Sequence, residues 1–306
     1  MQNKIDHFSL LLRDLEAEIG TRDVAELFFN AFIGSINSFK VENFEEFLLA
    51  FEELMKILCC TEPRFGILNY HFENLKCIFS KLKFKKGVSS NWKKRIIKEV
   101  KNVIKDIRNH SSELLMYAEK LDVEGKTILI HDHSHTVQDV LCHYKSMGKK
   151  FRVVIAEQDF DKTHDNIERL YNAKIPFQVV PSYMLSHIHD RIDMLFFGSL
   201  TLKNTMNFVM SPGTHGVISE FHFAKIPIYL FIDTDKFSLW NSKKRGDIFI
   251  YEHKRQHHRK QIEYERIKYS HDRVPAQLFT KIITNEGIFD FEGIKKLYIA
   301  KLNKGC

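Results

Sequence analysis

In this chain of 306 residues, the spacing of hydrophobic positions changes near residue 123. Before that point, apolar residues recur every three to four positions, which is typical of helices that bury one face. This part of the sequence shows neither the alternation of strands nor Pro-Gly turns. Its last helix is predicted over residues 93–121, with an apolar stripe made of Ile96, Ile97, Val100, Ile104, Ile107, Leu114 and Leu115. We expect four or five helices in sequence, which form an all-helical bundle domain at residues 1–123.

After residue 123, short apolar runs alternate with helical stretches of about a dozen residues. The runs lie at 127–131, 152–156, 177–180, 194–197 and 228–232. The helical stretches between them lie near 136–148, 163–174, 183–190 and 215–225. Continuous apolar strands separated by helices are typical of a parallel sheet covered on both faces. The sequence therefore predicts an α/β protein, with a Rossmann-like domain built on a mainly parallel sheet at residues 124–306.

Polar residues follow the first predicted strand, at the edge where such sheets bind ligands. They include His131, Asp132, Ser134, His135 and Thr136. One interpretation is a metal site, because histidines at alternate positions 131, 133 and 135 share one face of an extended chain. Such a site also needs ligands from the ends of later strands. The nearby candidate ligands, at 187–190, fall on a predicted helix instead. The competing interpretation, which we adopt, is that Ser134 and Thr136 cap a helix whose free N–H groups suit a phosphate.

A second predicted helix begins after the sequence Ser-Pro-Gly-Thr-His-Gly at 211–216. Gly213 allows the backbone to approach a ligand closely, and Thr214 can cap the helix or donate to an anion. We expect a phosphate or phosphosugar between this loop and the first strand end, with Lys236 adding positive charge. His131 and His135 would strengthen this binding below about pH 6.5, where imidazole protonates. The alternative is a pocket that the apolar side chains of Leu200 and Phe160 close.

Composition narrows the class of protein. A hydrophobic share of 44% allows a large core, and no run of eighteen apolar residues indicates a membrane span. The first residues mix charged and apolar side chains, unlike a signal peptide. The five cysteines form no C-x-x-C pair of the kind that holds zinc. We expect a cytoplasmic protein without a cofactor.

The net charge of +7 is concentrated in two basic segments. Residues 81–108 carry 11 Lys and Arg against 2 Asp and Glu, and residues 241–268 carry 9 against 4. Such segments can attract nucleic acid, RNA included, although they are more often a solvated helix face or a charged surface loop. Aromatic residues are sparse in both, so the sequence does not indicate a platform on which bases stack.

A series of short motifs along the second half resembles one known superfamily, and their order and spacing agree with it. They lie at 127–134 (Thr-Ile-Leu-Ile-His-Asp-His-Ser), 152–157, 173–176, 193–198, 212–214, 226–229, 235–238 and 275–287. The last contains Pro275, Leu278, Thr284 and Gly287, similar to a closing pattern P-x-x-L-[IF]-T-x-x-x-T-x-x-G. Together they resemble the initiation factor two-B and sugar-phosphate isomerase superfamily over residues 127 to about 299. The resemblance implies an all-helical domain followed by the α/β domain.

Two departures from that superfamily bear on activity. Its isomerases, which act on ribose 1,5-bisphosphate or methylthioribose 1-phosphate, use a cysteine and an aspartate where this chain has Asp132 and Leu200. A leucine cannot move a proton, and the isomerisation needs an acid and a base. The resemblance therefore implies the non-catalytic branch, with no catalytic residues in this chain. An enzyme that acts on phosphosugars with altered chemistry is the alternative that Asp132 leaves open.

The non-catalytic branch comprises the alpha, beta and delta regulatory subunits of initiation factor two-B, and the length and plan of this chain are most similar to alpha. Membership implies a homodimer through the α/β domains and assembly with related regulatory subunits. It also implies action on initiation factor two through guanine-nucleotide exchange. A vestigial pocket would hold a sugar phosphate or a nucleoside monophosphate.

Overall fold

The computed structural model describes residues 2–38, 43–60, 65–82, 89–131, 133–158, 160–239, 250–257, 262–269 and 271–304. The chain forms two compact units. The first unit combines Met1–Asp122 with Phe231–Leu239 and Ile282–Cys306, and the second combines Val123–Leu230 with Trp240–Lys281. The first unit's main segment thus ends one residue before the predicted domain boundary.

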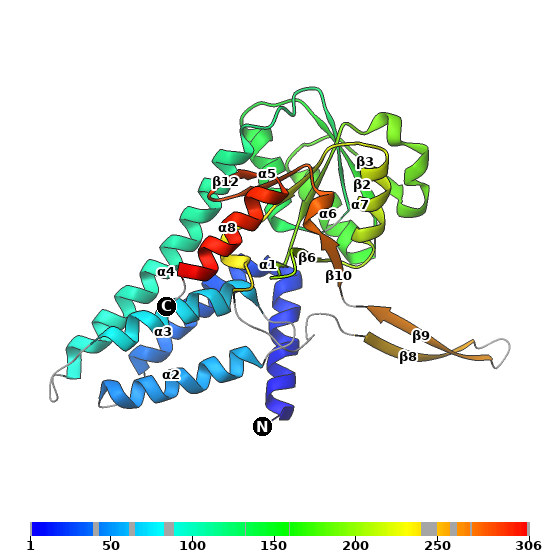
Figure 1. Ribbon diagram of the computed structural model, residues 1–306. Helices are drawn as coiled ribbons and strands as arrows, with labels where there is room; N and C mark the ends of the chain where they lie inside the picture. Colours follow the sequence, from blue (N-terminus) through cyan, green and yellow to red (C-terminus); the bar gives the residue numbers. More distant parts are fainter. Residues whose placement is uncertain are drawn as a thin grey trace. The chain divides into compact units, whose positions relative to one another are not determined.

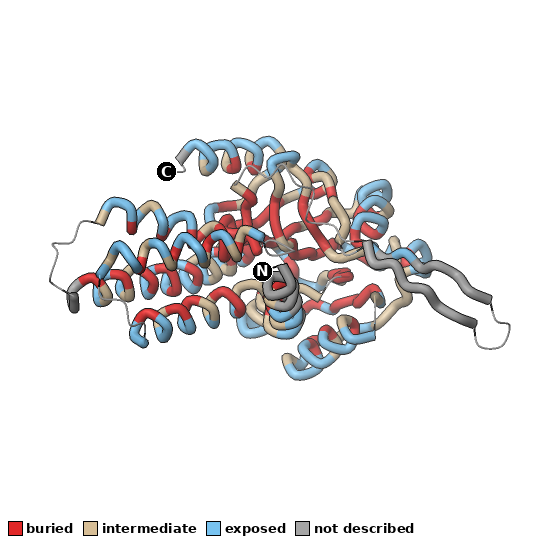
Figure 2. Tube along the Cα trace, turned by 90° about the horizontal axis from the view of Figure 1, so that it is seen from below, coloured by how far each residue is buried: buried red, intermediate tan, exposed pale blue. Residues whose placement is uncertain are grey.

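The main segment of the first unit is helical throughout its described residues, as the sequence predicts. Its helices are α1 (Gln2–Ser38), α2 (Phe44–Cys59), α3 (Gly66–Lys81) and α4 (Ser89–Ala118) (Figure 1). Their core is rich in phenylalanine: the ring centroid of Phe72 lies 5.2 Å from that of Phe29 and 5.6 Å from that of Phe51. On α4, Ile97 and Leu115 of the predicted stripe are half-buried and its other residues are buried, while the basic residues lie outside it. Buried and exposed positions alternate along the helices in Figure 2.

Two C-terminal segments complete the first unit. They contain the short 3-10 helix η3 (Thr234–Lys236), β11 (Lys281–Thr284), β12 (Gly287–Phe289) and α8 (Phe291–Lys304). β11 and β12 pair antiparallel around the turn that the sequence places before Gly287. The predicted α/β domain at 124–306 included both segments, because hydrophobic periodicity reports local structure and not which core a segment joins.

The second unit is built on parallel strands in the order β7-β4-β1-β2-β3. They are β1 (Thr127–Ile130), β2 (Arg152–Glu157), β3 (Phe177–Pro181), β4 (Met194–Gly198) and β7 (Ile228–Phe231). The pairs β1–β2, β1–β4 and β2–β3 are all parallel. All five strands lie at the predicted apolar runs, which confirms the mainly parallel sheet. The central positions of β1, β2 and β4 are buried (Figure 2), which explains why their runs are continuously apolar, whereas β3, the last strand in the order, has no fully buried residue.

Three helices follow the strands of the second unit, namely α5 (His135–Ser146), α6 (Phe160–Asn172) and α7 (Thr214–Phe223). The helix predicted near 183–190 is instead a pair of 3-10 turns, η1 (Ser182–His187) and η2 (His189–Arg191). Among the described helices, none is both long and apolar enough to cross a membrane.

Two small antiparallel sheets in the second unit were not predicted from the sequence. One joins β5 (Thr201–Leu202), β6 (Asn207–Met210) and β10 (Asp272–Pro275), which is followed by the 3-10 turn η4 (Ala276–Leu278). The other is a two-stranded ribbon of β8 (Ile250–His257) and β9 (Ile262–Tyr269).

Candidate functional site

The end of β1 and the start of α7 meet in the second unit, as the sequence predicts. His131, which follows β1 directly, is only 4% exposed, and its Nδ1 lies 3.3 Å from Oγ1 of Thr214. Gly213 precedes α7 with a φ of +89°, a left-handed conformation that favours glycine. A Cβ on Gly213 would lie 3.5 Å from Cε1 of His131. Three predicted residues, His131, Gly213 and Thr214, are therefore in close proximity.

Ser134 joins this cluster through the end of β4. It is the N-cap of α5, and its Oγ accepts a hydrogen bond of 3.4 Å from the N–H of Val137. A Cβ on Gly198, the last residue of β4, would lie 1.9 Å from Oγ of Ser134. Any larger residue at position 198 would displace that cap, so the glycine lets two strand ends approach each other.

Two further residues of the cluster were missed from the sequence. Lys162, in the first turn of α6, lies with its Nζ 3.5 Å from Oγ of Ser211 and close enough to His131 to act on it electrostatically. Gln158, just after β2, donates a hydrogen bond of 3.1 Å from Nε2 to the carbonyl oxygen of Pro212. Oε1 of Gln158 is buried, and no described atom donates to it. The sequence offered no signal for either residue, because the helix was predicted to begin only at 163 and Lys162 is in the first turn of α6.

The electrostatics of His131 differ from the prediction. Burial, together with the positive charge of Lys162, lowers the pKa of His131 from 6.5 to about 4. The imidazole therefore stays neutral at pH 5 to 6. The expected gain of a cationic donor below about pH 6.5 is wrong for His131, because the prediction assumed a solvated ring.

The other predicted ligand residues have different surroundings. His135 is the first residue of α5, and its ring centroid lies 4.7 Å from that of His133, which pairs with Asp165 of α6 at 3.8 Å. Thr136 is half-buried in the same turn. Asp132 is outside the residues that the structure describes. Within the described ranges, no group of three His, Cys, Asp or Glu side chains could hold a metal ion.

Lys236 and Phe160 do not have the surroundings expected of them. Lys236 belongs to the first unit, where it is 6% exposed and its charge acts on Asp233. The positive charge beside His131 comes instead from Lys162. Phe160 is 82% exposed and its ring stacks on that of His164, so it does not close a pocket.

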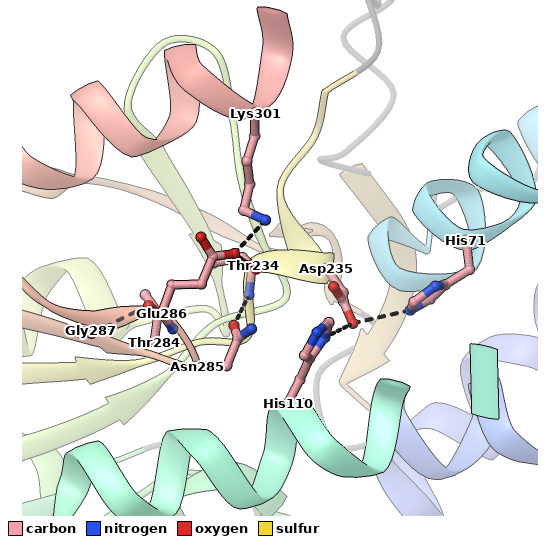
Figure 3. A network of polar contacts seen from close by, with 9 residues as sticks. All are labelled: His71, His110, Thr234, Asp235, Thr284, Asn285, Glu286, Gly287 and Lys301. Atoms are coloured by element: carbon pink, nitrogen blue, oxygen red, sulfur yellow. Dashed lines mark hydrogen bonds and ion pairs between the residues drawn. The ribbon is translucent and has the colours of Figure 1, made fainter. Parts of the chain in front are cut away.

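A second polar cluster lies in the first unit, centred on a buried carboxylate (Figure 3). Oδ2 of Asp235 lies 3.0 Å from Nε2 of His71 on α3 and 2.8 Å from Nδ1 of His110 on α4. Burial alone would raise the pKa of Asp235, but the hydrogen bonds from His110 and His71 hold it well below its usual range. In return, the hydrogen bond to Asp235 raises the pKa of His110. Both imidazoles also line a cleft of about 560 Å³ between α3 and α4.

The motif residues of the C-terminal half hold this carboxylate in place. In η3, Thr234 donates from its N–H to Oδ1 of Asn285 and from Oγ1 to Oε1 of Glu286, both at 2.9 Å. Glu286 in turn pairs with Lys301 of α8 (Figure 3). Within the β11–β12 turn, Oγ1 of Thr284 accepts from the N–H of Glu286 at 2.9 Å. These residues fix a turn and a short segment, which is a structural role.

Comparison with solved structures shows that the fold is shared. The structure matches the translation initiation factor eIF-2B of Pyrococcus horikoshii OT3 with a TM-score of 0.71 and 19% identity, over 90% of this chain and 94% of that one. It matches a chain of the tetrameric eIF2B-beta2-delta2 complex from C. thermophilum with a TM-score of 0.69 and 15% identity, over 98% and 94%. At these identities the likeness concerns the fold alone.

Two relatives are similar in sequence. The eIF2B alpha subunit of Dictyostelium discoideum is 27% identical over 138 residues, which is 45% of this chain and 43% of that protein. The eIF2B delta subunit of Schizosaccharomyces pombe is 27% identical over 150 residues, which is 48% of this chain and 32% of that protein. The aligned regions therefore span less than half the length of either relative.

The family model for the initiation factor 2 subunit family, IF-2B, matches residues 20–291. That range includes most of both compact units and every motif on which the resemblance depends. The chain belongs to the initiation factor 2 subunit family.

Proposed function

We propose that this chain is a regulatory subunit of the initiation factor two-B type, nearest to the alpha subunit, and that it acts in the cytoplasm by binding other proteins. The observation that carries the proposal is the family match over residues 20–291. Sequence relatives named as alpha and delta subunits support it. Its partners would be related regulatory subunits and, through them, initiation factor two.

The chemistry of the second unit supports a binding role and not an isomerase. The described cluster consists of His131, Ser134, Gln158, Lys162, Ser211, Gly213 and Thr214, which include neither a thiol nor a carboxylate. Leu200 replaces the aspartate that the family's isomerases use. His131 and Lys162 are the titratable side chains among these seven residues, and neither occupies position 132 or 200, which carry the cysteine and the aspartate in the family's isomerases.

The same cluster supports binding of a phosphosugar or a nucleoside monophosphate. Lys162 would attract the phosphate. At the start of α7 the N–H groups of Thr214 and His215 already donate to the carbonyl oxygen of Ser211 and to the carboxylate of Asp272, so the phosphate would depend on Lys162 and on side-chain donors. The buried Oε1 of Gln158 would accept a hydrogen bond from a sugar hydroxyl. Because an unpaired buried oxygen costs stability, a ligand that supplies this donor would be favoured.

A homodimer is supported by apolar surface on the second unit. Phe223, at the end of α7, is 90% exposed, and Tyr183 in η1 is 85% exposed. α7 and η1 contact each other, so the two exposed side chains belong to neighbouring elements. Exposed apolar patches commonly mark interfaces between identical chains. Replacing Phe223 with Ser should shift the mass measured by light scattering from a dimer toward the 36.2 kDa of one chain.

Two measurements on the purified chain test the main proposal. The first is a coupled assay with ribose 1,5-bisphosphate and methylthioribose 1-phosphate, which should give no turnover, whereas a rate near 10 per second would overturn the binding role. The second is thermal unfolding with a panel of phosphosugars and nucleoside monophosphates. A ligand present at one hundred times its Kd should stabilise the chain by about 2.7 kcal/mol. If no compound raises the unfolding temperature, the ligand part of the proposal fails and the protein-binding part is tested by capture of related subunits.

A further inference from the structure

We propose that one exposed face of α4 binds the phosphate backbone of double-stranded RNA. The face is a row of lysines within the first basic segment, which we call the lysine stripe: Lys94, Lys98, Lys101 and Lys105. The stripe belongs to the first unit alone and shares no residue with the ligand cluster of the second unit. The proposal therefore does not depend on the function proposed above.

The spacing of the four lysines places them on one side of the helix. They follow one another after four, three and four residues, and at about 100° per residue they lie within an arc of about 60°. All four are exposed, and the row is about 16 Å long. The opposite side of the same stretch carries the buried residues Ile96, Val100, Val103, Ile104 and Ile107.

The lysine stripe has no acidic partner among the residues that the structure describes. The neighbouring arginines of α4 do have one. Arg95 pairs with Glu99 at 3.2 Å, one turn further along the helix. Arg108 pairs with Glu26 of α1 at 2.7 Å. Glu99 and Asp106 line the cleft between α3 and α4, which no lysine of the stripe does. The stripe is therefore a row of positive charge that the described acidic side chains leave unneutralised.

The lysine stripe differs from an ordinary solvated helix face. Such faces commonly combine glutamate and lysine, because opposite charges four residues apart stabilise a helix and like charges at that spacing destabilise it. In the stripe, three successive neighbours have the same charge. Residues 1–80 of the same unit carry 7 Lys and Arg against 13 Asp and Glu, so positive charge is not general to this unit. A bound polyanion would relieve the repulsion.

The surroundings of the lysine stripe favour a phosphate backbone over a protein or a membrane. Lysine is depleted at protein interfaces, whose centres are apolar, and the exposed large apolar side chain described on α4 is Met116, near the end of the helix. A membrane-binding helix inserts its apolar face, whereas that of α4 is buried in the core. Successive lysines are about 4.5–6 Å apart along the axis, which is of the same order as the spacing of phosphates along one strand.

The aromatic residues of α4 favour a duplex over a single strand. Proteins that bind single strands without sequence preference stack the bases on aromatic side chains. On α4 these are Trp92, which is buried, and Tyr117, which is half-buried near the end of the helix. Duplex RNA is recognised by its shape and by contacts to phosphate and 2′-hydroxyl groups. A row of lysines meets that requirement, and we expect binding without sequence preference.

Fluorescence anisotropy with the full-length chain and a fluorescein-labelled RNA duplex of twelve base pairs tests the proposal. With four phosphate contacts, the logarithm of affinity should fall against the logarithm of salt concentration with a slope of about 3.6. Raising the salt from 50 to 200 mM should then weaken binding by about 150-fold. The double variant Lys98→Gln, Lys101→Gln should lower the slope to about 1.8 and weaken binding at least tenfold at 50 mM salt. Lys98→Arg with Lys101→Arg keeps the charge and should retain affinity within about threefold.

The matched control removes two exposed lysines from other helices, with Lys56→Gln on α2 and Lys145→Gln on α5. It changes the net charge equally and should leave the slope unchanged and the affinity within about threefold. An unchanged slope in the stripe variant, or an equal loss in the control, would overturn the proposal. So would tighter binding of a single strand of the same length, or binding of phosphatidylserine vesicles without binding of the duplex. Circular dichroism of each variant checks that it has folded.

Discussion

The two units of this protein bury histidines in opposite electrostatic surroundings. In the first unit, His71 and His110 share one oxygen of Asp235, and the hydrogen bond to Asp235 raises the pKa of His110. In the second, His131 has a hydroxyl neighbour in Thr214 and a cationic neighbour in Lys162, and burial lowers its pKa to about 4. Burial alone favours the neutral ring, and only a carboxylate in direct contact reverses that preference.

The difference indicates what each cluster does. In the first unit, positive and negative groups compensate each other and connect two helices to the segment that carries Asp235, which is the arrangement expected of a structural cluster. In the second unit, the buried Oε1 of Gln158 accepts from no described group, and Lys162 adds positive charge. A cluster with unused hydrogen-bonding capacity is suited to a ligand.

The largest effect is expected from Asp235→Asn. Removing the charge leaves His110 and His71 beside a neutral amide in a buried site, and breaking a buried pair typically costs about 3–5 kcal/mol. Urea unfolding at pH 7 measures the loss. The exposed Asp106→Asn on α4 is the control and should change the unfolding free energy by less than about 0.5 kcal/mol. A loss below about 1 kcal/mol for Asp235→Asn would contradict the structural role.

The sequence predicted the helices of the first unit's main segment and the five parallel strands of the second unit, but not the packing that brings polar residues into clusters. Apolar stripes such as Ile96, Val100 and Ile107 specify a helix because period 3.6 is local. The strand at 127–130 was found for the same reason. Asp235 and His110, by contrast, are 125 residues apart in sequence and meet only because one segment packs with the helices. No periodic pattern contains that information.

The candidate site was predicted in part, again for physical reasons. His131, Gly213 and Thr214 lie together because strand ends and helix starts converge at one edge of a parallel sheet. Lys162 was missed and Lys236 was chosen in its place, since the sequence gives the charge of a residue but not its neighbours.

The second-largest effect is a loss of stability at low pH, which tests whether His131 is neutral in the folded chain. Between about pH 6.5 and pH 4 the unfolded chain binds a proton at this position and the folded chain does not, so stability is lost as pH falls. From pH 7 to pH 5 the loss should be about 2 kcal/mol. His131→Gln should lack this part of the loss, which urea unfolding at both pH values measures. If the variant and the original chain lose equal stability, His131 is solvated and the comparison fails.

The third effect concerns the ligand cluster. Lys162→Met should weaken binding of a phosphate-bearing ligand by about tenfold, or about 1.4 kcal/mol, because the nearest cation is removed. Lys145→Met, at an exposed position of α5, is the matched control and should leave the affinity unchanged. Isothermal titration with the compound that gives the strongest thermal stabilisation measures both. Equal affinity in the two variants would exclude Lys162 from the site.

The smallest expected effect is the contribution of His110 to stability, and it depends on pH in the opposite direction from that of His131. His110 has a raised pKa, first because of its hydrogen bond to Asp235 and then because of the charges of Asp235, Asp233 and Glu113, while burial opposes the rise. The stability that its protonated form contributes is therefore fully present below about pH 6.5, the unfolded value, and is lost as pH rises through the folded pKa. The side chain is 26% exposed and lines an open cleft, so solvent screening limits the contribution to about 1 kcal/mol.

His110→Gln keeps a hydrogen-bond donor at this position and removes the titration. The gap in unfolding free energy between the original chain and the variant should be largest near pH 6 and smaller at pH 9. That trend is the reverse of the one expected for His131, where the gap in favour of the original chain shrinks as pH falls. Chemical shifts of the histidine rings at pH 5.5 should agree, with His110 protonated and His131 neutral. If the two rings titrated together, the carboxylate of Asp235 would not distinguish the two clusters.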